Sequence, residues 1–578
     1  MRLLLDIETT LDHSKIWCVV TKDLDTNEVK VWKEANDLSE YIKAASLIVA
    51  HNGIAFDFHL LKKLWKCQIT LKRVEDTLVL SRLLNPSLDG GHSLNNLGNL
   101  LGTQKIDYTK IWSWITGINL ILDKKHIGYN GYYEGMQFDK PHIPLLHYYC
   151  IKDVEVLHKV YSYLKYELKR QDFSIKSQEL EHEVQAIIAQ QERNGFKFNE
   201  QSAMQLLAEF KTRLEAITVE MQSIFPAKVT TGRTHKTTGR PLSDIVEDFN
   251  PGSRKQIAER LIEKGWKPSK FTEKTNAPIV DETTLEGSDI PEAKAIAEYL
   301  MLQKRIAQVE SWIEAIQADG RVHGRVISNG TVTGRMTHIK PNMAQVPNSI
   351  AIYGPECRDL WTVEKGCKLV GIDASGLELR MLAHYMNDNE YTNEVVSGDI
   401  HTANQKAAGL ETRSQAKTFI YAFLYGAGAA KIGSVVGGSQ KEGQKLITRF
   451  LRNTPKLQRL RERVSEAFTA RGVLLGLDGR KLLVRSEHSA LNTLLQGAGA
   501  IAMKQALVFL HKDLTKQKIP FKLVANVHDE WQIEVPEKYA EQVGQSGVTA
   551  ITDAGVEFKM NCPLTGEYKI GDTWKQTH

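Results

Sequence analysis

The sequence predicts a multidomain protein of the α/β class. Its 578 residues exceed what one hydrophobic core usually holds, so we expect roughly three or four domains. In the first 168 residues, short apolar runs such as "RLLLDIE" and "LIVAHNGIAF" alternate with helix-like segments. From residue 367 onward, strand-like runs such as "KLVGID" and "FKLVANV" flank a long helical stretch. This alternation is typical of α/β domains.

Composition narrows the class of protein. The 74 Lys and Arg residues outnumber the 69 Asp and Glu residues by only 5, so any contact with nucleic acid must use local basic surface. The six cysteines show neither metal-type pairs nor a disulfide framework, which favours reduced thiols in a cytosolic compartment. We see no signal peptide and no apolar run of membrane-spanning length, and therefore expect a soluble intracellular protein without a membrane partner.

Helical periodicity takes over from residue 177 to 225, with a stop signal at Asn194-Gly195, and we place a domain boundary near residue 175. The next segment, "PAKVTTGRTHKTTGRP", contains no acid and almost no apolar side chain, which predicts an exposed basic loop. The loop is either a solvated linker or a phosphate-contacting segment, and the sequence favours neither. Its cations are Lys228, Arg233, Lys236 and Arg240.

A first group of acids lies in the N-terminal part of the chain. Asp6 and Glu8 are two apart on a predicted strand, so both carboxylates face the same side, and a divalent metal is the economical compensation for their repulsion. Asp57 is a further acid, and Tyr149 and Asp153 share one face of a predicted helix. Asp-x-Glu alone is a weak signal of function. Four acids and a tyrosine together, however, are what a two-metal phosphodiester hydrolysis site needs.

A second acidic pair stands at strand ends. Asp373 ends "KLVGID" and Asp529 follows "KLVANVH", about 150 residues later. If the two strands are neighbours, this pair can hold two metals. A lone strand-end Asp is more often a turn or cap residue, so the surrounding residues must decide.

The helix between these acids carries a regular stripe. In "RSQAKTFIYAFLYGAG", Arg413, Lys417, Tyr421 and Tyr425 recur every four residues; the first three lie within roughly 80° and the four span about 18 Å. That length suits a nucleoside triphosphate, with cations at the phosphates and rings at sugar and base. The alternative is a surface helix with two solvated cations and core aromatics.

The ordered motifs resemble a known family. Asp6-x-Glu8, Asn52-x(4)-Asp57 and Tyr149-x(3)-Asp153 are similar to the three motifs of DnaQ-like 3′→5′ exonucleases. "DASGLELR" at Asp373, the Arg413-to-Gly426 pattern and "VHDE" at 527–530 resemble motifs A, B and C of the family A (Pol I-like) DNA polymerases. "FNPGSRKQI", "TVTGR", "GDIHT" and "ALNTLLQGAGA" extend the match over nearly the whole chain, which is similar to the replicative polymerases of T-seven-type short-tailed bacteriophages.

The resemblance implies an RNase H-like (DnaQ-like) exonuclease domain followed by a right-hand polymerase. The implied divisions are 1–175, exonuclease; 176–365, mostly helical thumb and palm entry with the basic loop at 226–248; 366–395, palm with motif A; 396–488, fingers with the motif B helix at 413–426; and 489–578, palm with the motif C hairpin at 521–535.

The resemblance also implies cofactors and roles. Asp373, the Ala374 carbonyl and Asp529 would bind two Mg²⁺ ions, and Asp6, Glu8, Asp57 and Asp153 would bind two more, with Mn²⁺ as a substitute. Arg413, Lys417 and His401 would neutralise the phosphates, with Lys417 as general acid for pyrophosphate. Glu378 and Tyr421 would exclude a 2′-hydroxyl, so deoxynucleotides are the expected substrate, and Tyr421 implies weak rejection of nucleotides lacking the 3′-hydroxyl. The residues implied to contact DNA are Arg335, Gln345, Gln496 and His528.

One segment departs from the pattern. T-seven-type polymerases carry a long thumb insertion that recruits thioredoxin, whereas the segment from Phe225 to about Asp248 has only some two dozen residues, so thioredoxin is not expected as a partner. We hypothesise that the basic loop grips duplex phosphates directly.

The expected activity is template-directed DNA synthesis with 3′→5′ proofreading in the cytoplasm of an infected bacterium. Primer-template DNA and dNTPs are the expected partners, together with a phage helicase-primase and a single-strand-binding protein. A stand-alone exonuclease with a DNA clamp, a single-subunit RNA polymerase and a structural DNA-binding protein are alternatives. Asp373, Asp529, Arg413 and Lys417 argue against the first, Glu378 and the exonuclease motifs against the second, and two acidic sites against the third.

Overall fold

The computed structural model describes residues 1–118, 133–233, 235, 237–272 and 274–578. Internal contacts divide the chain into two compact units, each assembled from separate stretches. The first unit comprises Met1–Asn194, Arg325–Ile339 and Val370–Ile570, and the second comprises Gly195–Gly324, Lys340–Leu369 and Gly571–His578.

A five-stranded sheet organises the N-terminal part of the first unit, in the order β3-β2-β1-β4-β5. Strand β1 pairs antiparallel with β2 and parallel with β4. Because side chains alternate along a strand, Leu3 and Leu5 pack on one face of β1 and Leu4 on the other, so both faces are covered. The strands are β1 (Arg2–Thr9), β2 (Ile16–Asp23), β3 (Val29–Trp32), β4 (Leu47–Ala50) and β5 (Val74–Asp76).

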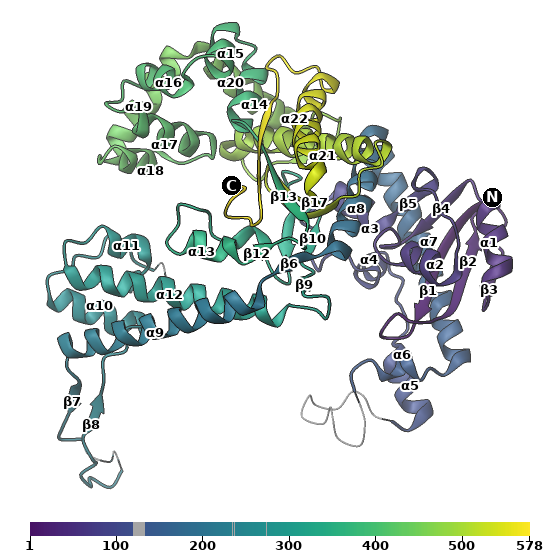
Figure 1. Ribbon diagram of the computed structural model, residues 1–578, viewed down its shortest axis with the longest axis horizontal. Coiled ribbons are helices and arrows are strands. Elements are labelled where there is room, and N and C mark those ends of the chain that lie inside the picture. The colour runs from purple at the N-terminus through teal and green to yellow at the C-terminus, as the bar shows by residue number, and fades with distance from the viewer. Residues whose placement is uncertain (119–132, 234, 236, 273) are drawn as a thin grey trace. The chain divides into compact units, whose positions relative to one another are not determined.

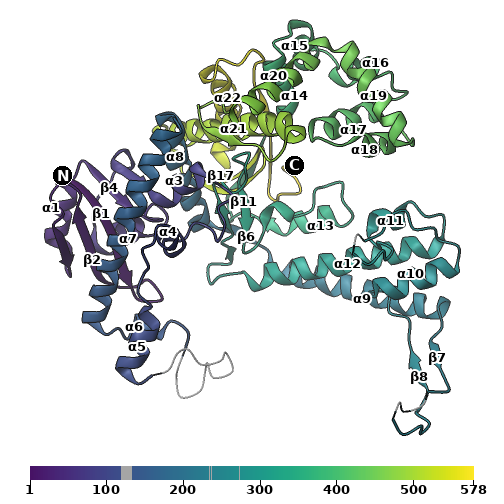
Figure 2. The same cartoon turned by 180° about the vertical axis from the view of Figure 1, so that it is seen from behind.

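One long helix covers the Leu4 face of this sheet. Helix α7 contacts both β1 and β2, and Figure 2 shows it running along the sheet. Its residues Val154 and Leu157 share a core with Leu4. The helices of this part are α1 (Ala35–Ala44), α2 (Asp57–Trp65), α3 (Thr77–Leu84), α4 (Leu94–Leu100), α5 (Tyr108–Thr116), α6 (Met136–Asp139) and α7 (Ile143–Arg170).

A four-stranded sheet, in the order β16-β17-β13-β18, lies in the C-terminal part of the first unit. Strands β16 and β17 form a hairpin in which Val527 pairs with Glu530 across His528 and Asp529. The apolar side chains of β17 are buried, as expected, but the intervening Gln532 and Glu534 are buried as well. The strands are β13 (Cys367–Ala374), β16 (Lys522–Val527), β17 (Glu530–Pro536) and β18 (Gly566–Gly571).

Four helices pack around the C-terminal sheet: α8 (Ile175–Asn194), α14 (Leu377–Met386), α21 (Ala490–Lys516) and α22 (Ala540–Glu557). The stretch Glu487–Lys516, which contains α21, is long and apolar enough to cross a membrane, contrary to the expectation that no such run exists. However, 78% of its apolar window is buried against other parts of the protein, and α21 packs on α8, α14 and α22. We therefore describe α21 as a core helix.

A group of helices separates β13 from α21 in the sequence. Helix α17 begins with a capping box in which Thr412 and Gln415 bond each other's backbone, and it ends at Leu424, so Tyr425 is its C-cap and the helix is two residues shorter than expected. The elements are α15 (Asn389–Val396), α16 (Ile400–Ala408), α17 (Arg413–Leu424), α18 (Ala429–Val435), α19 (Gln440–Asn453), α20 (Pro455–Arg471), β14 (Val473–Leu475) and β15 (Lys481–Leu483); a small hairpin, β10 (Arg325–Ile327) and β11 (Thr337–Ile339), completes the first unit.

The second unit is mostly helical, with α9 packed along α12. The predicted basic loop contains two strands, because the β-branched residues of β7 and β8 pair as a hairpin that extends beyond α9 (Figure 1). The elements are β6 (Phe196–Phe198), α9 (Glu200–Ile224), β7 (Lys228–Thr230), β8 (Ile245–Glu247), α10 (Arg254–Glu263), α11 (Glu282–Glu286), α12 (Pro291–Glu314), β9 (Arg321–Val322), α13 (Gly354–Asp359) and β12 (Trp361–Thr362).

Candidate active sites

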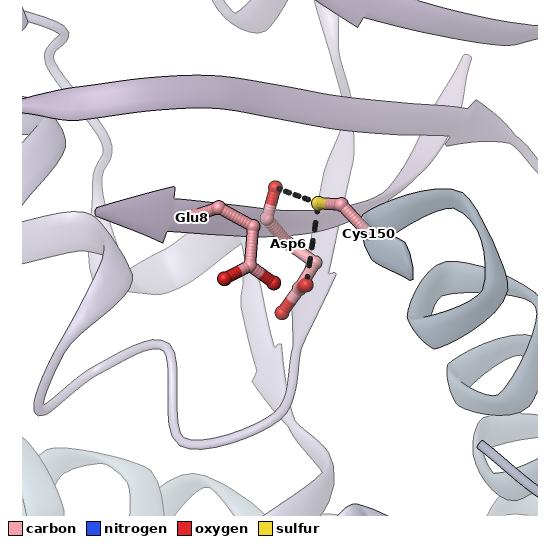
Figure 3. Close-up of side chains that lie close together, drawn as sticks. All are labelled: Asp6, Glu8 and Cys150. Carbon is pink, nitrogen blue, oxygen red and sulfur yellow. Dashed lines mark hydrogen bonds between the residues drawn. The ribbon is translucent and has the colours of Figure 1, made fainter. Parts of the chain in front are cut away.

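The N-terminal site is built on β1. Asp6 and Glu8 follow Leu4 at intervals of two residues along the strand, so their side chains lie on the same face as Leu4, which α7 covers. Figure 3 shows both carboxylates on one side of the strand, with the Cys150 thiol reaching them from α7. Cys150 Sγ donates to Asp6 Oδ2 over 3.4 Å. Strand periodicity therefore places two acids together, as the sequence predicted.

A third acid, Asp57, begins α2 and is only 4% exposed. The loop before it is held by Asp76, whose carboxylate accepts the backbone N–H groups of Asn52 over 2.8 Å and Ile54 over 3.1 Å. Asn52 adopts φ of +64°, a left-handed conformation that asparagine tolerates better than most residues. Burial raises the pKa of Asp57, and the charge of Asp6 raises it further.

Helix α7 contributes the remaining predicted residues, Tyr149 and Asp153. Asp153 is 3% exposed and forms an ion pair with Lys105, whose ammonium also lies 4.9 Å from the centre of the Tyr149 ring. Among the described residues, Asp153 Oδ1 accepts no hydrogen bond. A buried carboxylate oxygen without a donor fits a site that receives a cation.

The electrostatics of this site follow from burying several acids together. Burial, followed by the charge of Asp153, raises the pKa of Asp6 to about 7, while Lys105 opposes the shift. Burial and then Asp6 raise the pKa of Glu8. Burial raises the pKa of the Cys150 thiol. The acids destabilise one another's charged forms, and a divalent cation would relieve that repulsion.

The C-terminal site joins the two strand-end acids. Strand β17 lies directly beside β13, and the backbone N–H of Ala374 donates to the backbone carbonyl of Asp529 over 3.2 Å. His528, the first of the two hairpin-loop residues, adopts φ of +59°, where glycine is more usual. This backbone arrangement places Asp373 and Asp529 at adjoining strand ends.

Burial and neighbouring acids raise the pKa of both carboxyl groups. Burial and the charges of Asp529 and Glu530 raise the pKa of Asp373 to about 7. Burial and Glu378 raise the pKa of Asp529 to about 6. Carboxylate oxygens of this kind are the ligands that Mg²⁺ prefers.

Glu378 lies at the start of α14 and is held from two sides. Its Oε1 accepts the Tyr425 hydroxyl over 3.0 Å and Arg335 Nη2 over 3.2 Å. Its charge raises the pKa of both Tyr425 and Tyr421, after burial. The predicted residues Glu378, Tyr421 and Arg335 therefore gather beside Asp529.

The predicted stripe on α17 extends from this group. Arg413 and Lys417 are exposed, and their charges lower the pKa of His401, after burial, so the three lie together. The His401 ring lies 6.2 Å from that of Tyr421. Arg413 Nε donates to Asp399 Oδ2 over 2.7 Å, which holds the pKa of Asp399 below its usual range.

The remaining predicted DNA contacts belong to other elements of the chain. Gln496 is half-buried on α21 and bonds Asn492 over 2.8 Å, whereas Gln345 is exposed in the second unit. In the basic segment, Lys228 Nζ lies 3.3 Å from a Glu259 oxygen and 3.4 Å from a Glu263 oxygen. The segment contains no acid in its own sequence, but the fold brings two acids to Lys228. Arg233 and Arg240 lie in the hairpin, and Lys236 lies outside the described residues.

Sequence reasoning missed Lys105, Cys150, Asp76 and Asp399. Asp399 had a usable signal, since an acid directly before a helix is a common N-cap, and it accepts the His401 and Thr402 N–H groups. Lys105 and Cys150 had none, because only the folded chain brings them to β1.

Comparison with known proteins agrees with the motifs. The family model "DNA polymerase family A" matches residues 227–576. The DNA-directed DNA polymerase of Enterobacteria phage T3 is 34% identical, with 94% of each chain covered, and that of Escherichia phage T7 is 34% identical, with 98% of each covered. The T7 alignment runs over 701 residues, so that relative has stretches that this 578-residue chain lacks.

A solved structure agrees in fold over the whole chain. The "POL domain of Pol1 from M. smegmatis complex with DNA primer-template and dNTP" matches 100% of this chain and 96% of its own, with a TM-score of 0.80 and 18% identity. The family expected from the motifs is thus confirmed. The chain belongs to DNA polymerase family A, as a DNA-directed DNA polymerase of the T7 phage type with the palm, fingers and thumb fold of that family.

Proposed function

We propose that this polymerase extends a primer along a DNA template with dNTPs at the C-terminal site, and that the N-terminal site removes nucleotides from the 3′ end. The observation that carries the proposal is the hydrogen bond from the Ala374 backbone N–H to the Asp529 backbone carbonyl, which brings the half-buried Asp373 and Asp529 to adjoining strand ends. The bound primer-template and dNTP named for the M. smegmatis structure support the same substrates here.

Each site would take two Mg²⁺ ions, with Mn²⁺ as a substitute, because burial and neighbouring acids raise the pKa of Asp6 and of Asp373 and a divalent cation would offset the repulsion between the acids. Asp373, the Ala374 carbonyl and Asp529 would hold one pair. Bound Mg²⁺ would lower the pKa of the attacking hydroxyl or water and neutralise charge on the leaving oxygen. The second pair would be held by Asp6, Glu8, Asp57 and Asp153.

The α17 stripe would bind the triphosphate. Arg413, Lys417 and His401 offer positive charge or N–H donors to its β- and γ-phosphates, and exposed Lys417 would give a proton to the departing pyrophosphate. Because Arg413 Nε donates to Asp399 Oδ2, phosphate would compete with that carboxylate for Arg413.

The sugar would lie against Glu378 and Tyr421. Tyr425 and Arg335 fix the Glu378 carboxylate, so it would exclude a 2′-hydroxyl and select deoxynucleotides. The Tyr421 hydroxyl would replace a missing 3′-hydroxyl and so weaken rejection of dideoxynucleotides. Arg335, Gln345, Gln496 and His528 would contact the duplex, mainly through minor-groove acceptors common to all base pairs.

We infer the same domain roles as the motifs imply: exonuclease at 1–175, thumb within 176–365, fingers at 396–488 and palm on either side of the fingers. The protein would act in the cytoplasm of the infected host, with a phage helicase-primase and a single-strand-binding protein. The short β7–β8 segment, and the longer T7 alignment, support replication without thioredoxin.

The test is extension of a labelled primer on a longer template with Mg²⁺, with and without dNTPs. We expect wild type to extend with dNTPs and to shorten the primer without them. Asp529→Asn should abolish only extension, and Asp6→Asn with Glu8→Gln should abolish only shortening. Asp25→Asn, which removes the exposed ion pair with Arg2, is the matched control and should leave both activities unchanged.

The outcomes separate the alternatives. Degradation without any extension by wild type would replace this proposal with a nuclease that clamps DNA. Extension that survives Asp529→Asn, or shortening that survives the double substitution, would overturn the corresponding site assignment.

A further inference from the structure

The loop that leads to Asp57 is held by a carboxylate to which the proposed chemistry gives no role. Asp76, 1% exposed at the end of β5, accepts the backbone N–H groups of Asn52 and Ile54, and also that of Leu78 over 2.9 Å. Three N–H donors converge on one buried carboxylate, and hydrogen bonds to an ionised acceptor are among the strong ones. The position of Asp76 therefore decides where the loop before Asp57 runs.

Asp76 is in turn held by a histidine that is distant in the sequence. Helix α8 packs beside α3, which Asp76 caps, as both overall views show (Figures 1 and 2). The Asp76 backbone N–H donates to Nε2 of His182 on α8 over 2.7 Å, and His182 Nδ1 lies 2.7 Å from the Gln178 carbonyl oxygen. His182 is 5% exposed, so little water reaches either bond.

These two bonds fix the protonation of the His182 ring. A ring nitrogen that accepts an N–H has no proton of its own, so Nε2 is the acceptor and Nδ1 carries the proton that the Gln178 carbonyl accepts. The uncharged ring in this tautomer satisfies both neighbours at once. An alkyl side chain at this position would leave the Asp76 N–H buried without its acceptor.

The Asp57 carboxylate stands at the far end of these contacts. Asp57 begins α2 directly after the loop, and after burial the charges of Asp6 and then Asp76 raise its pKa, so it lies near both. A displacement of the loop would move Asp57 relative to Asp6. Misplacement of a reacting group by about 1 Å can cost roughly 100-fold in rate.

We propose that His182 is a positioning residue for the N-terminal site. Its neutral ring holds Asp76, and Asp76 holds the loop that sets Asp57 against Asp6. Helix α8 also packs on α21 and β16, so the residue that sets the N-terminal site lies on a helix of the C-terminal core. The effect of His182 on shortening rests on the proposed nuclease function, but its hold on the loop does not.

The first measurement is amide hydrogen exchange in the full-length protein, which needs neither metal nor DNA. We expect His182→Leu to speed exchange at Asn52 and Ile54 by about fivefold or more, because the acceptor of their N–H groups is no longer held. His182→Gln keeps an acceptor oxygen at similar reach and should stay near wild type. The matched control is Gln185→Leu. Gln185 is also 5% exposed on α8, but it accepts the Ser328 hydroxyl over 2.9 Å, so its loss should leave the loop unchanged.

The second measurement is the shortening of a labelled primer as a function of Mg²⁺ concentration, with extension as the reference. Loss of a partner that orients a metal ligand typically weakens metal binding or activity on the order of 10- to 100-fold, so His182→Leu should need about 10-fold more Mg²⁺ for half-maximal shortening. Extension should be unchanged, and His182→Gln should restore most of the shortening. A residue that supported only the fold would lower both activities together.

A second variant breaks the same contacts at another point and serves if His182→Leu does not fold. Asp76→Asn replaces one carboxylate oxygen with an amide –NH₂ that faces a backbone N–H instead of accepting it. It should reproduce both the faster exchange of the loop and the higher Mg²⁺ requirement.

The outcomes separate this proposal from the nuclease assignment. Unchanged loop exchange or an unchanged Mg²⁺ requirement in folded His182→Leu, or equal effects in Gln185→Leu, would overturn the role of His182 while shortening by wild type keeps the nuclease assignment. If exchange rises in His182→Leu but wild type never shortens DNA, the hold on the loop stands and the nuclease assignment is wrong.

Discussion

Lys105 places a positive charge where the buried acids of the N-terminal site gather. Its charge lowers the pKa of Asp6, which still reaches about 7, and of Asp153. Cation binding requires deprotonated carboxylates, so at limiting Mg²⁺ the rate of shortening should rise as pH passes through about 7. Lys105→Gln raises these pKa values and should move the rise to higher pH by about one unit or more.

The control for this pH profile is Lys152→Gln. Lys152 also pairs with an acid of α7, Glu155, but both side chains are substantially exposed. Its loss should leave the profile within about 0.2 units, because exposed pairs contribute little. Equal shifts in the two variants would mean that general charge, rather than the Lys105 contact, governs the titration.

Single residues differ in how well the sequence reveals them. Asp6 and Glu8 could be placed together because strand periodicity is local and the spacing of two fixes the face. Lys105 and Cys150 could not, since the first lies about 100 residues away in a segment without a motif and the second depends on which face of α7 meets β1.

At the scale of elements, Asp399 links the start of α16 to the start of α17. It caps α16 and pairs with Arg413. Asp399→Asn should keep the cap but release Arg413 for phosphate. Because exposed ion pairs are weak, the KM for dNTP should fall by no more than about fivefold in steady-state extension.

The matched variant for this element is Asp399→Ala, which removes both the ion pair and the cap. It should lower the midpoint of urea unfolding in addition to releasing Arg413, because the N–H groups of His401 and Thr402 lose their cap. A KM that rises in the Asn variant would instead mean that Asp399 helps to position Arg413 for the triphosphate.

The β7–β8 hairpin carries the second prediction about elements. Arg233 and Arg240 are available to phosphates, whereas Lys228 is occupied by Glu259 and Glu263. Replacing both arginines with Gln should make the plot of log K for duplex DNA binding against log salt less steep, its negative slope shrinking in magnitude by about 1.8. The same change should shorten the extension products. Lys228→Gln should change the slope less.

A charge-matched control for the hairpin is Lys516→Gln with Lys518→Gln, exposed residues at the C-terminal end of α21. If that pair lowers the slope as much as the arginines do, overall charge accounts for DNA binding and the hairpin has no special role.

Elements with local signals were predictable from the sequence. The start of α17 has a capping box that fixes it. The hairpin was predicted as a loop, because each strand is three residues long and becomes a strand only through its pairing with the other. Short strands without a long apolar pattern carry too little periodic signal.

At the scale of the whole molecule, strand order was the feature least accessible from the sequence. The sequence suggested Asp373 and Asp529 as a pair only if their strands were neighbours, and it is β17, rather than β16, that lies beside β13. That order depends on packing among α8, α14, α21 and α22, whose contacts join residues far apart in the chain. Family resemblance supplied what local pattern could not.

One such long-range contact is a buried ionic cluster between α8 and α21. Lys504 Nζ lies 2.6 Å from Glu181 Oε1, and Arg480 Nη1 lies 2.5 Å from the same oxygen, with all three side chains at most 2% exposed. Burial lowers the pKa of Lys504 to about 8, against the attraction of Glu181, so the ammonium remains mostly charged at pH 7. The cluster ties segments more than 300 residues apart.

Lys504→Met should therefore lower the free energy of unfolding by about 3 kcal/mol, because it leaves part of a buried negative charge uncompensated. Lys512→Met is the matched control: Lys512 also joins α21 to α8, through Glu183 at 2.8 Å, but its side chain is 60% exposed. Its loss should cost less than about 1 kcal/mol. Urea unfolding at pH 7 distinguishes the two, and equal shifts of the midpoint would mean that burial of the Glu181 cluster adds nothing to the joint between the helices.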